Sequence, residues 1–451
     1  MSGYAEYREV NLPWLKAVPA HWEIRRNKNI FTEQKEIVGE RSADYTLLSL
    51  TLNGIIPRDM DGGGKFPESF DKYKIVKNGD MAFCLFDIDE TPRTVGLSGY
   101  NGMLTGAYTI MRVSNINARF IYYYYLALDN GKMLRPLYTG LRKTININTF
   151  QSTKVPVPPR EEQDQIVRFL DWKVSSINKL INIKKKEIKA IDALKRSTVS
   201  RAITRGLTAD APMKYSGVKW LGDIPQRWYT VPLYAIAQVK SINNCIDLPL
   251  MSVYLDAGVV PFVEREEKRT NTTSKDLTNY QRVDPGDFVL NNQQAWRGSV
   301  GVSFHSGIVS PAYIVLSLNN TLDSHYANYL FRSRCMVDQY LVISRGVGSI
   351  QRNLYWSALK RVVVPIPSKK EQMEIVEYLD GLNNKFDATI KKLTEEVAVL
   401  EEYKNKIIAD TVTGKIDVRS IEIPEYEFVD EDNDNVDENL EQGADEPPEE
   451  E

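Results

Sequence analysis

Two long stretches of the chain place apolar residues at alternating intervals of three and four. The first carries Leu170, Val174, Ile177, Ile181, Ile188 and Ile191, and the second carries Leu379, Phe386, Ile390, Leu393, Val397, Leu400 and Ile407. Such a stripe is typical of a helix that pairs with another helix. A proline pair ahead of each stretch forces an extended entry, and acidic residues then favour a helix N-terminus. The pattern predicts coiled-coil helices over residues 158–207 and 367–419.

Ahead of each predicted helix, the pattern changes to short β-prone runs separated by Gly, Asn and Asp. In the first block these runs fall at residues 45–52, 81–85 and 108–113, and the second block has matching runs. Each block also contains one helical interval, at residues 120–128 and 326–332. The pattern therefore predicts two mixed α/β domains, over residues 1–157 and 208–366.

The two halves of the chain repeat each other. The motif W-L-x-x-x-P-x-x-W occurs from Trp14 and again from Trp220, and P-x-P-x-x-x-E-Q-x-x-I-x-x-x-L occurs from Pro156 and again from Pro365. Because the offset stays within a few residues of 206, the halves are a duplication with small loop differences. The predicted fold class is α+β, with two duplicated domains separated by two long helices that pair as an antiparallel coiled coil with pseudo-two-fold symmetry.

Antiparallel pairing would carry the second domain to the end of the helix pair opposite the first. Each helix has about 40 residues, so at ~1.5 Å per residue the pair is roughly 60 Å long. Two readers at that distance lie about one to one and a half turns of DNA apart. The arrangement predicts a protein that reads two half-sites across an unread spacer. Lys184 and Lys195 interrupt the first stripe, so we expect part of that face to meet another surface.

Charge is distributed unevenly along the chain. The net charge is −3, but residues 420–451 hold 15 Asp and Glu and no Lys or Arg, which leaves a body near +12. The surplus is consistent with a polyanionic partner, and we expect the acidic tail to be disordered. The three cysteines show no metal-type spacing, and no apolar run reaches the roughly 20 residues of a membrane span. We therefore expect a cytoplasmic protein without a membrane partner.

The repeated motifs resemble those of the specificity subunit of type I restriction–modification enzymes, over residues 10–419. The doubled P-x-P-x-x-x-E-Q-x-x-I-x-x-x-L resembles that family's central and distal conserved regions, and the tryptophan motifs resemble the openings of its target-recognition domains. The resemblance implies that each domain reads one half of a bipartite site in double-stranded DNA. It also implies that the helices dock two modification subunits, with restriction subunits outside. S-adenosylmethionine, ATP and Mg²⁺ chemistry would belong to these partners, and no cofactor to this chain.

The densest set of candidate base-reading side chains follows the Gly286-Asp287 turn. Asn292, Gln293, Gln294 and Arg297 supply amide and guanidinium groups suited to adenine and guanine edges. A polar loop that caps a sheet is the alternative interpretation. The corresponding stretch of the first domain, residues 87–93, offers carboxylates and Arg93, and its carboxylates would repel phosphate.

Further basic residues are candidate phosphate contacts. They comprise Arg58, Lys65, Arg142, Lys143, Lys268, Arg269, Arg345 and Arg352. Arg142-Lys143 and Arg345 with Arg352 occupy matching places just before the helices, which favours a shared role. For the others, a solvated surface loop is an equally ordinary explanation.

Motifs for catalysis are missing from the sequence. Gly62-Gly63-Gly64-Lys65 lacks the leading glycine and trailing Ser/Thr of a phosphate-binding loop, and no base-methylation motif occurs. The E-x-K half of a nuclease signature at residues 266–268 has no partner motif. A non-catalytic DNA-binding subunit is the leading hypothesis. The alternatives are a self-sufficient nuclease or methyltransferase, and a coiled-coil scaffold without DNA preference.

Overall fold

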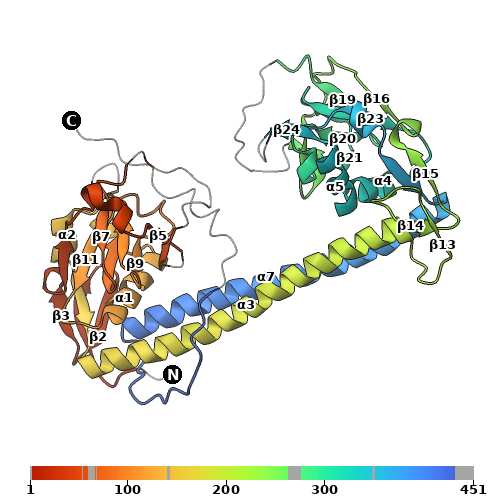
Figure 1. Cartoon of the computed structure of the whole chain (residues 1–451). Helices are drawn as coiled ribbons and strands as arrows, with labels where there is room; N and C mark the ends of the chain where they lie inside the picture. The colour runs from red at the N-terminus through yellow and green to blue at the C-terminus, as the bar shows by residue number, and fades with distance from the viewer. Residues whose placement is uncertain are drawn as a thin grey trace. The chain divides into compact units, whose positions relative to one another are not determined.

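The computed structural model describes residues 3–52, 54–58, 67, 69–139, 143–262, 276–347 and 351–431. The chain divides into two compact units, the first made of residues 1–186 and 393–451 and the second of residues 187–392. Each unit contains one mixed α/β domain and about half of each long helix (Figure 1). The two long helices are α3 (Arg160–Arg205) and α7 (Lys369–Val412). The first unit holds the start of α3 and the end of α7, and the second holds the end of α3 and the start of α7.

The domain of the first unit is built on an antiparallel four-stranded sheet in the order β4-β11-β8-β9. Two-stranded pairs surround it, β1-β2, β3-β12, β5-β6 and β7-β10. Helix α1 contacts β9 (Figure 1) and shares a core with the sheet through Phe120, Tyr125, Phe83 and Met111. The element bounds are β1 Tyr7–Leu12, β2 Leu15–Pro19, β3 Glu23–Arg26, β4 Phe31–Gln34, β5 Leu48–Thr51, β6 Gly54–Pro57, β7 Lys74–Val76, β8 Asp80–Phe83, β9 Val95–Leu97, β10 Gly102–Leu104, β11 Thr109–Val113, α1 Ala118–Asn130, α2 Ile147–Ser152 and β12 Lys154–Val157.

The domain of the second unit repeats this topology. Its four-stranded sheet has the order β16-β23-β20-β21, and its pairs are β13-β14, β15-β26, β17-β18 and β19-β22. It adds the hairpin β24-β25. The bounds are β13 Met213–Tyr215, β14 Asp223–Pro225, β15 Tyr229–Pro232, β16 Ala237–Val239, β17 Met251–Tyr254, β18 Gly258–Pro261, β19 Gln281–Val283, β20 Phe288–Asn291, β21 Val300–Val302, β22 Gly307–Val309, β23 Tyr313–Leu318, α4 Ser324–Arg332, α5 Arg334–Ile343, β24 Arg345–Val347, β25 Gln351–Asn353, α6 Trp356–Leu359 and β26 Val363–Ile366.

The long helices pair inside each unit, as their stripes predict, and the pairing is antiparallel, as expected for the fold class. In the first unit, Ile177 and Ile181 of α3 share a buried core with Val397 and Ile407 of α7. The start of one helix therefore lies beside the end of the other. In the second unit the pairing is reversed, because the end of α3 shares a core with Ile375 and Leu379 at the start of α7.

The two lysines that interrupt the stripe face carboxylates of α7. Lys184 pairs with Glu396 in the first unit. Lys195 pairs with Asp387 in the second unit at 2.6 Å. The lysine heads are each about a quarter exposed, so the stripe interruptions are cross-helix ion pairs at the rim of the helix pair.

The repeated Glu-Gln motif locks each helix to the domain ahead of it. Glu162 accepts a hydrogen bond from the indole N–H of Trp22 at 2.9 Å, and Glu371 accepts the equivalent bond from Trp228 at 3.0 Å. Both tryptophans are buried. A sequence-distant tryptophan and glutamate thus meet in the same way in each unit, which explains why both motifs occur twice.

The glutamine of the motif bonds a helix cap and the proline pair. Gln163 Oε1 accepts from the backbone N–H of Asn117, and Gln372 Oε1 accepts from that of Asp323. Asn117 and Asp323 are the N-caps of α1 and α4. Each glutamine also donates to the carbonyl of the second proline of its pair, Pro158 or Pro367. Because both glutamines are buried, the bonds satisfy groups that have no water.

The repeated Gly-Asp motif is a turn with an ion pair. Gly79 and Gly286 have φ angles of +88° and +93°, a conformation that glycine adopts without strain. The aspartates that follow accept hydrogen bonds from backbone N–H groups three residues back, and pair with Arg112 in one domain and Lys240 in the other. These aspartates are buried, and their bonds hold the turn against the sheet.

A glycine ends each long helix against the opening tryptophan motif of a domain. Gly206 and Gly414 have φ angles of +72° and +76°. A Cβ on Gly414 would lie 2.4 Å from Pro19 Cδ and 3.2 Å from the Trp22 ring, and one on Gly206 would lie 3.3 Å from the Trp228 ring. The end of α7 therefore returns to the start of the first domain, as the end of α3 leads into the second.

Replacing Gly414 with alanine is expected to destabilise the first unit by about 2–4 kcal/mol, because left-handed strain and overpacking against Pro19 add. Gly79→Ala is the matched control, since its φ is also positive but nothing lies within 4 Å of the added Cβ. Its expected cost is about 1–2 kcal/mol. Amide exchange of the first unit compares the stability of the two variants. An equal loss of stability in both would show that the close contact of Gly414 with Pro19 and Trp22 does not matter.

Candidate nucleic-acid interface

The amide-rich loop of the second domain leaves the central strand β20. Asn291 ends the strand, and the short 3₁₀ turn Ala295–Arg297 closes the loop at Gly298, whose φ is +109°. The Asn291 side chain accepts from the backbone N–H of Gln293, and Trp296 donates its indole N–H to the Gln293 carbonyl at 2.9 Å. The backbone is therefore organised internally, while the side chains of Gln293 and Arg297 are exposed.

The hairpin β24-β25 joins this loop. Leu354 donates its N–H to the Asn292 carbonyl at 2.9 Å. The guanidinium groups of Arg297 and Arg352 lie 4.8 and 5.9 Å from the centroid of the Trp296 ring, within the range of cation–π attraction. The structure thus brings Arg352, predicted separately as a phosphate contact, beside the amide loop that carries Asn292 and Arg297.

Arg345 lies one strand away from Arg352. It pairs with Asn353 in the hairpin and is exposed. The Oδ1 atom of Asn292 is enclosed and lacks a hydrogen-bond partner among the described residues. Its neighbours Gln293 and Arg297 are exposed and are the side chains of this loop most accessible to a ligand.

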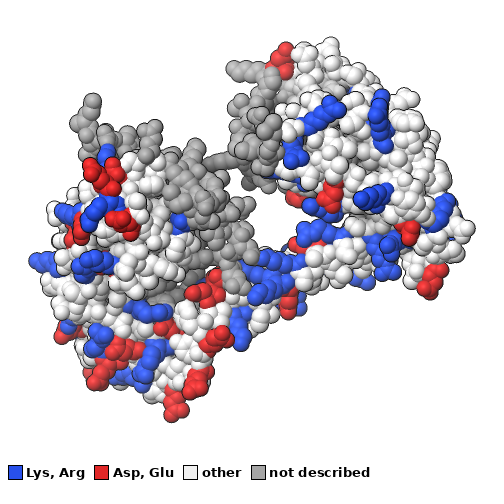
Figure 2. Space-filling view, in the orientation of Figure 1, with Lys and Arg blue, Asp and Glu red and all other residues white. Residues whose placement is uncertain are grey.

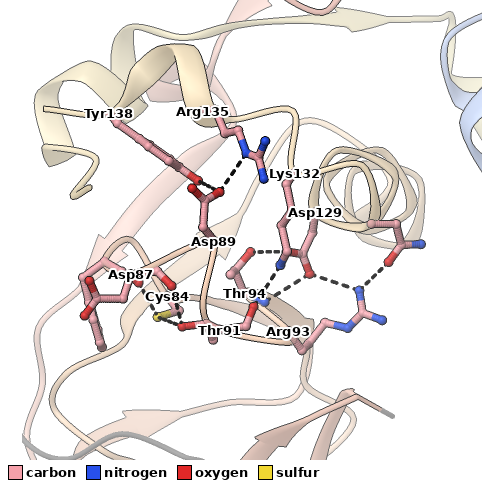
Figure 3. A network of polar contacts seen from close by, with 12 residues as sticks. Cys84, Asp87, Asp89, Thr91, Arg93, Thr94, Asp129, Lys132, Arg135 and Tyr138 are labelled. Atoms are coloured by element: carbon pink, nitrogen blue, oxygen red, sulfur yellow. Dashed lines mark hydrogen bonds and ion pairs between the residues drawn. The ribbon is translucent and has the colours of Figure 1, made fainter. Parts of the chain in front are cut away.

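The matching loop of the first domain is a closed polar network (Figure 3). Asp129, at the end of α1, is buried and accepts from Arg93 at 3.0 Å, from Lys132 at 2.8 Å and from the hydroxyl of Thr94 at 2.7 Å. Arg93, a predicted DNA contact, therefore has a structural partner. Its side chain is 15% exposed, which limits the surface that it offers to DNA.

Asp89 is engaged on the other side of the same loop. It accepts from Arg135 at 2.8 Å and from the Tyr138 hydroxyl at 3.0 Å (Figure 3). Lys143 Nζ lies 3.5 Å from the same carboxylate. Burial acts to raise the pKa of Asp89, but the bonds from Arg135 and Tyr138 outweigh it and hold this pKa below its usual range. The carboxylate thus stays charged and paired, and the predicted phosphate contact Lys143 is drawn into the same network.

Cys84 closes the base of this loop. Its thiol contacts the carbonyl of Phe86 and the hydroxyl of Thr91. Burial raises the pKa of the thiol to about 11, and a protonated buried thiol is unreactive. Cys84 is therefore a packing residue.

Arg93→Ala is expected to destabilise the first unit by about 2 kcal/mol, because it leaves a buried carboxylate with fewer partners. Arg135→Ala is the matched control, since Arg135 is 64% exposed and exposed ion pairs contribute about 1 kcal/mol or less. Thermal unfolding measures both. Unchanged stability in Arg93→Ala together with weaker DNA binding would instead favour a direct contact.

Other predicted residues are more scattered. Arg58 is half-buried after β6 and donates its backbone N–H to Leu47. Lys65, Arg142, Lys268 and Arg269 lie outside the described residues, as does the E-x-K stretch at 266–268.

A groove on the second domain was not predicted from the sequence. It has a volume of about 650 Å³ and is lined by Tyr234, Ala237, Gln238, Val239, Trp356, Lys360 and Arg361. Two adjacent cations beside aromatic rings suit a ligand that carries a phosphate group and a planar ring. The only signal in the sequence is the Lys-Arg pair, which is too common to single out.

The duplicated architecture defines a class of protein with two recognition domains of one fold and different loop chemistry. The chain belongs to the type I restriction modification DNA specificity domain family, whose profile matches residues 70–191 and 225–399. It is the DNA-recognition subunit of such a system and is not itself the catalyst. This family accounts for the doubled Glu-Gln motif, which both matched regions include.

Similar proteins agree with this assignment over nearly the whole chain. The chain is 24% identical to the type I restriction enzyme MjaVIII specificity subunit of Methanocaldococcus jannaschii, over 92% of this chain and 98% of that protein. It is 24% identical to the putative type I restriction enzyme MjaX specificity subunit of the same organism, over 89% and 95%. A chain from a solved type I R-M system has the same fold, with a TM-score of 0.58, 14% identity, and coverage of 88% of this chain and 99% of that one.

The described residues contain neither a membrane-spanning helix nor a cluster of metal-binding side chains. Neither long helix, nor any other helix in the described part of the chain, is apolar enough over a sufficient length to cross a membrane. Within the same residues, His, Cys, Asp and Glu side chains do not gather in groups of three that would suit a metal ion.

Proposed function

We propose that each domain reads one half of a bipartite, asymmetric DNA site and that the helices set the unread spacer. The observation that supports this most is that one duplicated scaffold carries two different loops. The same Trp–Glu and cap–Gln bonds hold both domains. The loop after β8 is acidic and self-paired, whereas the loop after β20 is rich in amides and arginine. Two such loops would read different bases.

The base-reading set in this proposal is Asn292, Gln293, Gln294 and Arg297, with Arg345 and Arg352 on phosphate beside it. Amide and guanidinium groups match the major-groove edges of adenine and guanine. In the first domain, Arg58, Lys65, Arg93, Arg142 and Lys143 remain candidates, and Lys268 and Arg269 remain so in the second. Residues 1–157 and 208–366 are the exchangeable readers, and residues 158–207 and 367–419 are the spacer.

The helices would dock two modification subunits, with restriction subunits outside them in a cytoplasmic complex. In the first unit the helix pair exposes Leu180, Ile183, Val399 and Tyr403, and in the second it exposes Leu194, Met373 and Tyr378. Exposed large apolar side chains on helices suit partner helices. S-adenosylmethionine, ATP and Mg²⁺ would be bound by those partners.

Mapping methylated sites in a genome that carries this gene and its modification partner tests the proposal. A two-part asymmetric site with a fixed spacer is expected. Replacing residues 10–155 with the domain of a homologue should change only one half of that site, and replacing residues 208–366 should change only the other. A continuous site, or both halves changing after one exchange, would contradict it.

A further inference from the structure

The chain does not leave the molecule where helix α7 ends. After bends at residues 415–416 and a turn at residues 419–420, residues 421–431 run along α3 within the first unit, in the same direction as that helix. Gln165 donates to the carbonyls of Val418 and Ile421 at 3.1 and 2.8 Å. We call residues 421–431 the strap. The tail was expected to be disordered from residue 420, but its first residues are held in place.

Backbone groups of the strap are bonded by a polar stripe of α3. Ser175 donates to the carbonyl of Glu427 at 2.9 Å and accepts from the N–H of Val429 at 2.7 Å. Asn178 and Asn182 donate to the carbonyls of Val429 and Asp430 at 3.2 and 2.9 Å. Positions 175, 178 and 182 lie on one face of a helix, so α3 carries a built surface for an extended peptide.

Apolar and charged contacts complete the surface. The Arg119 guanidinium lies 5.5 Å from the Phe428 ring, and Ile421 and Ile423 pack against the core of the unit. At the far end, Glu431 pairs with Lys185 at 2.7 Å and with Lys404. The strap therefore ends on cations of both helices. Lys and Arg side chains gather along the long helices on the face that Figure 2 shows.

The duplicate helix has no such surface. The positions of α7 that correspond to Ser175, Asn178 and Asn182 are Asn384, Asp387 and Lys391, at the offset of 209 that relates the two Glu-Gln motifs. All three are exposed, whereas the three residues of α3 are 2–6% exposed. The stripe is thus a feature of one helix and is not inherited from the duplication.

We propose that this stripe is a docking surface for the chain's own C-terminal segment and anchors it beside the lysines of the helix pair. The acidic residues that follow the strap then compete with DNA for those lysines. Beyond Glu431 the chain continues for 20 residues with ten Asp and Glu and no Lys or Arg. Tethering to an anchored strap gives these carboxylates a high effective concentration at the lysines. Non-specific affinity for DNA comes mainly from such cations.

Truncation of residues 432–451 in the full-length protein tests the proposal by titration with double-stranded DNA that lacks the recognised site. Affinity at low salt is expected to rise about three- to tenfold, and the difference is expected to vanish at high salt, where charges are screened. A tail of equal length with its ten carboxylates changed to amides should behave like the truncation. Superimposable binding curves for full-length and truncated protein at every salt concentration would overturn the competition.

A second measurement tests the anchor itself. The double variant Asn178→Ala/Asn182→Ala removes two strap bonds while keeping good helix formers, and Asn384→Ala/Lys391→Ala is the matched control on α7. Amide exchange at Val429 should accelerate at least tenfold in the first variant only. Unchanged exchange would overturn the docking surface. The titration uses non-specific DNA and the amide exchange uses no DNA, so neither measurement depends on half-site reading. Either proposal can therefore be contradicted while the other stands.

Discussion

Glu162→Ala is expected to destabilise the first unit by about 3–5 kcal/mol. The carboxylate is 5% exposed and accepts from the Tyr4 hydroxyl at 2.5 Å, His21 Nε2 at 2.7 Å and Trp22 Nε1 at 2.9 Å. Its removal leaves the buried donors of Tyr4 and Trp22 without an acceptor, which costs about 1–3 kcal/mol for each group. Burial and the bond to Glu162 raise the pKa of Tyr4 above its ordinary value, so this hydroxyl stays a donor at every physiological pH.

Amide exchange resolved by segment is the appropriate measurement, because a chain of two units need not unfold in one step. Glu161→Ala is the matched control, since Glu161 is the exposed neighbour on the same helical turn. Glu371→Ala should produce the corresponding loss in the second unit alone, where Trp228, Arg227 and Ser368 lose their acceptor. Equal protection in Glu161→Ala and Glu162→Ala would contradict the locking role of the motif.

The second large effect is expected on recognition. The triple variant Gln293→Ala/Gln294→Ala/Arg297→Ala should lower affinity for the recognised site about 100-fold or more, because each well-placed base contact contributes about 1–3 kcal/mol. Gln293 and Arg297 are exposed, so the unfolding of the second unit should change little. Discrimination should relax only in the half-site that this domain reads.

Competition binding with DNA in which one half-site is scrambled measures this effect. Arg334→Ala is the control, because it removes an exposed cation of the same domain that pairs only locally with Asp338 among the described residues. A uniform loss over all DNA sequences in the triple variant would assign the loop to phosphate contact. No loss at all would leave the loop as a cap of the sheet.

Much of the candidate interface could be located from the sequence but not understood from it. The amide loop was recognisable because four amides stand in a row beside Arg297. Its neighbours were not, because Arg352 reaches Trp296 through a hairpin more than fifty residues later. Arg93 was a reasonable DNA candidate by charge, yet its partner Asp129 lies 36 residues away on α1. Charge alone does not distinguish a cation that faces solvent from one that neutralises a buried carboxylate.

The sequence by itself determined the duplication, the two domains and the two paired helices, because apolar spacing and repeated motifs are local properties of a chain. It marked Trp22 and Glu162 as important without connecting them. Only the tertiary structure decided that connection, since the two residues are 140 positions apart and meet through a single hydrogen bond. The strap depended on the tertiary structure even more. The polar side chains of Ser175, Asn178 and Asn182 bond backbone groups of the strap. Because every residue has these groups, the strap sequence carries no pattern from which the docking surface could be predicted.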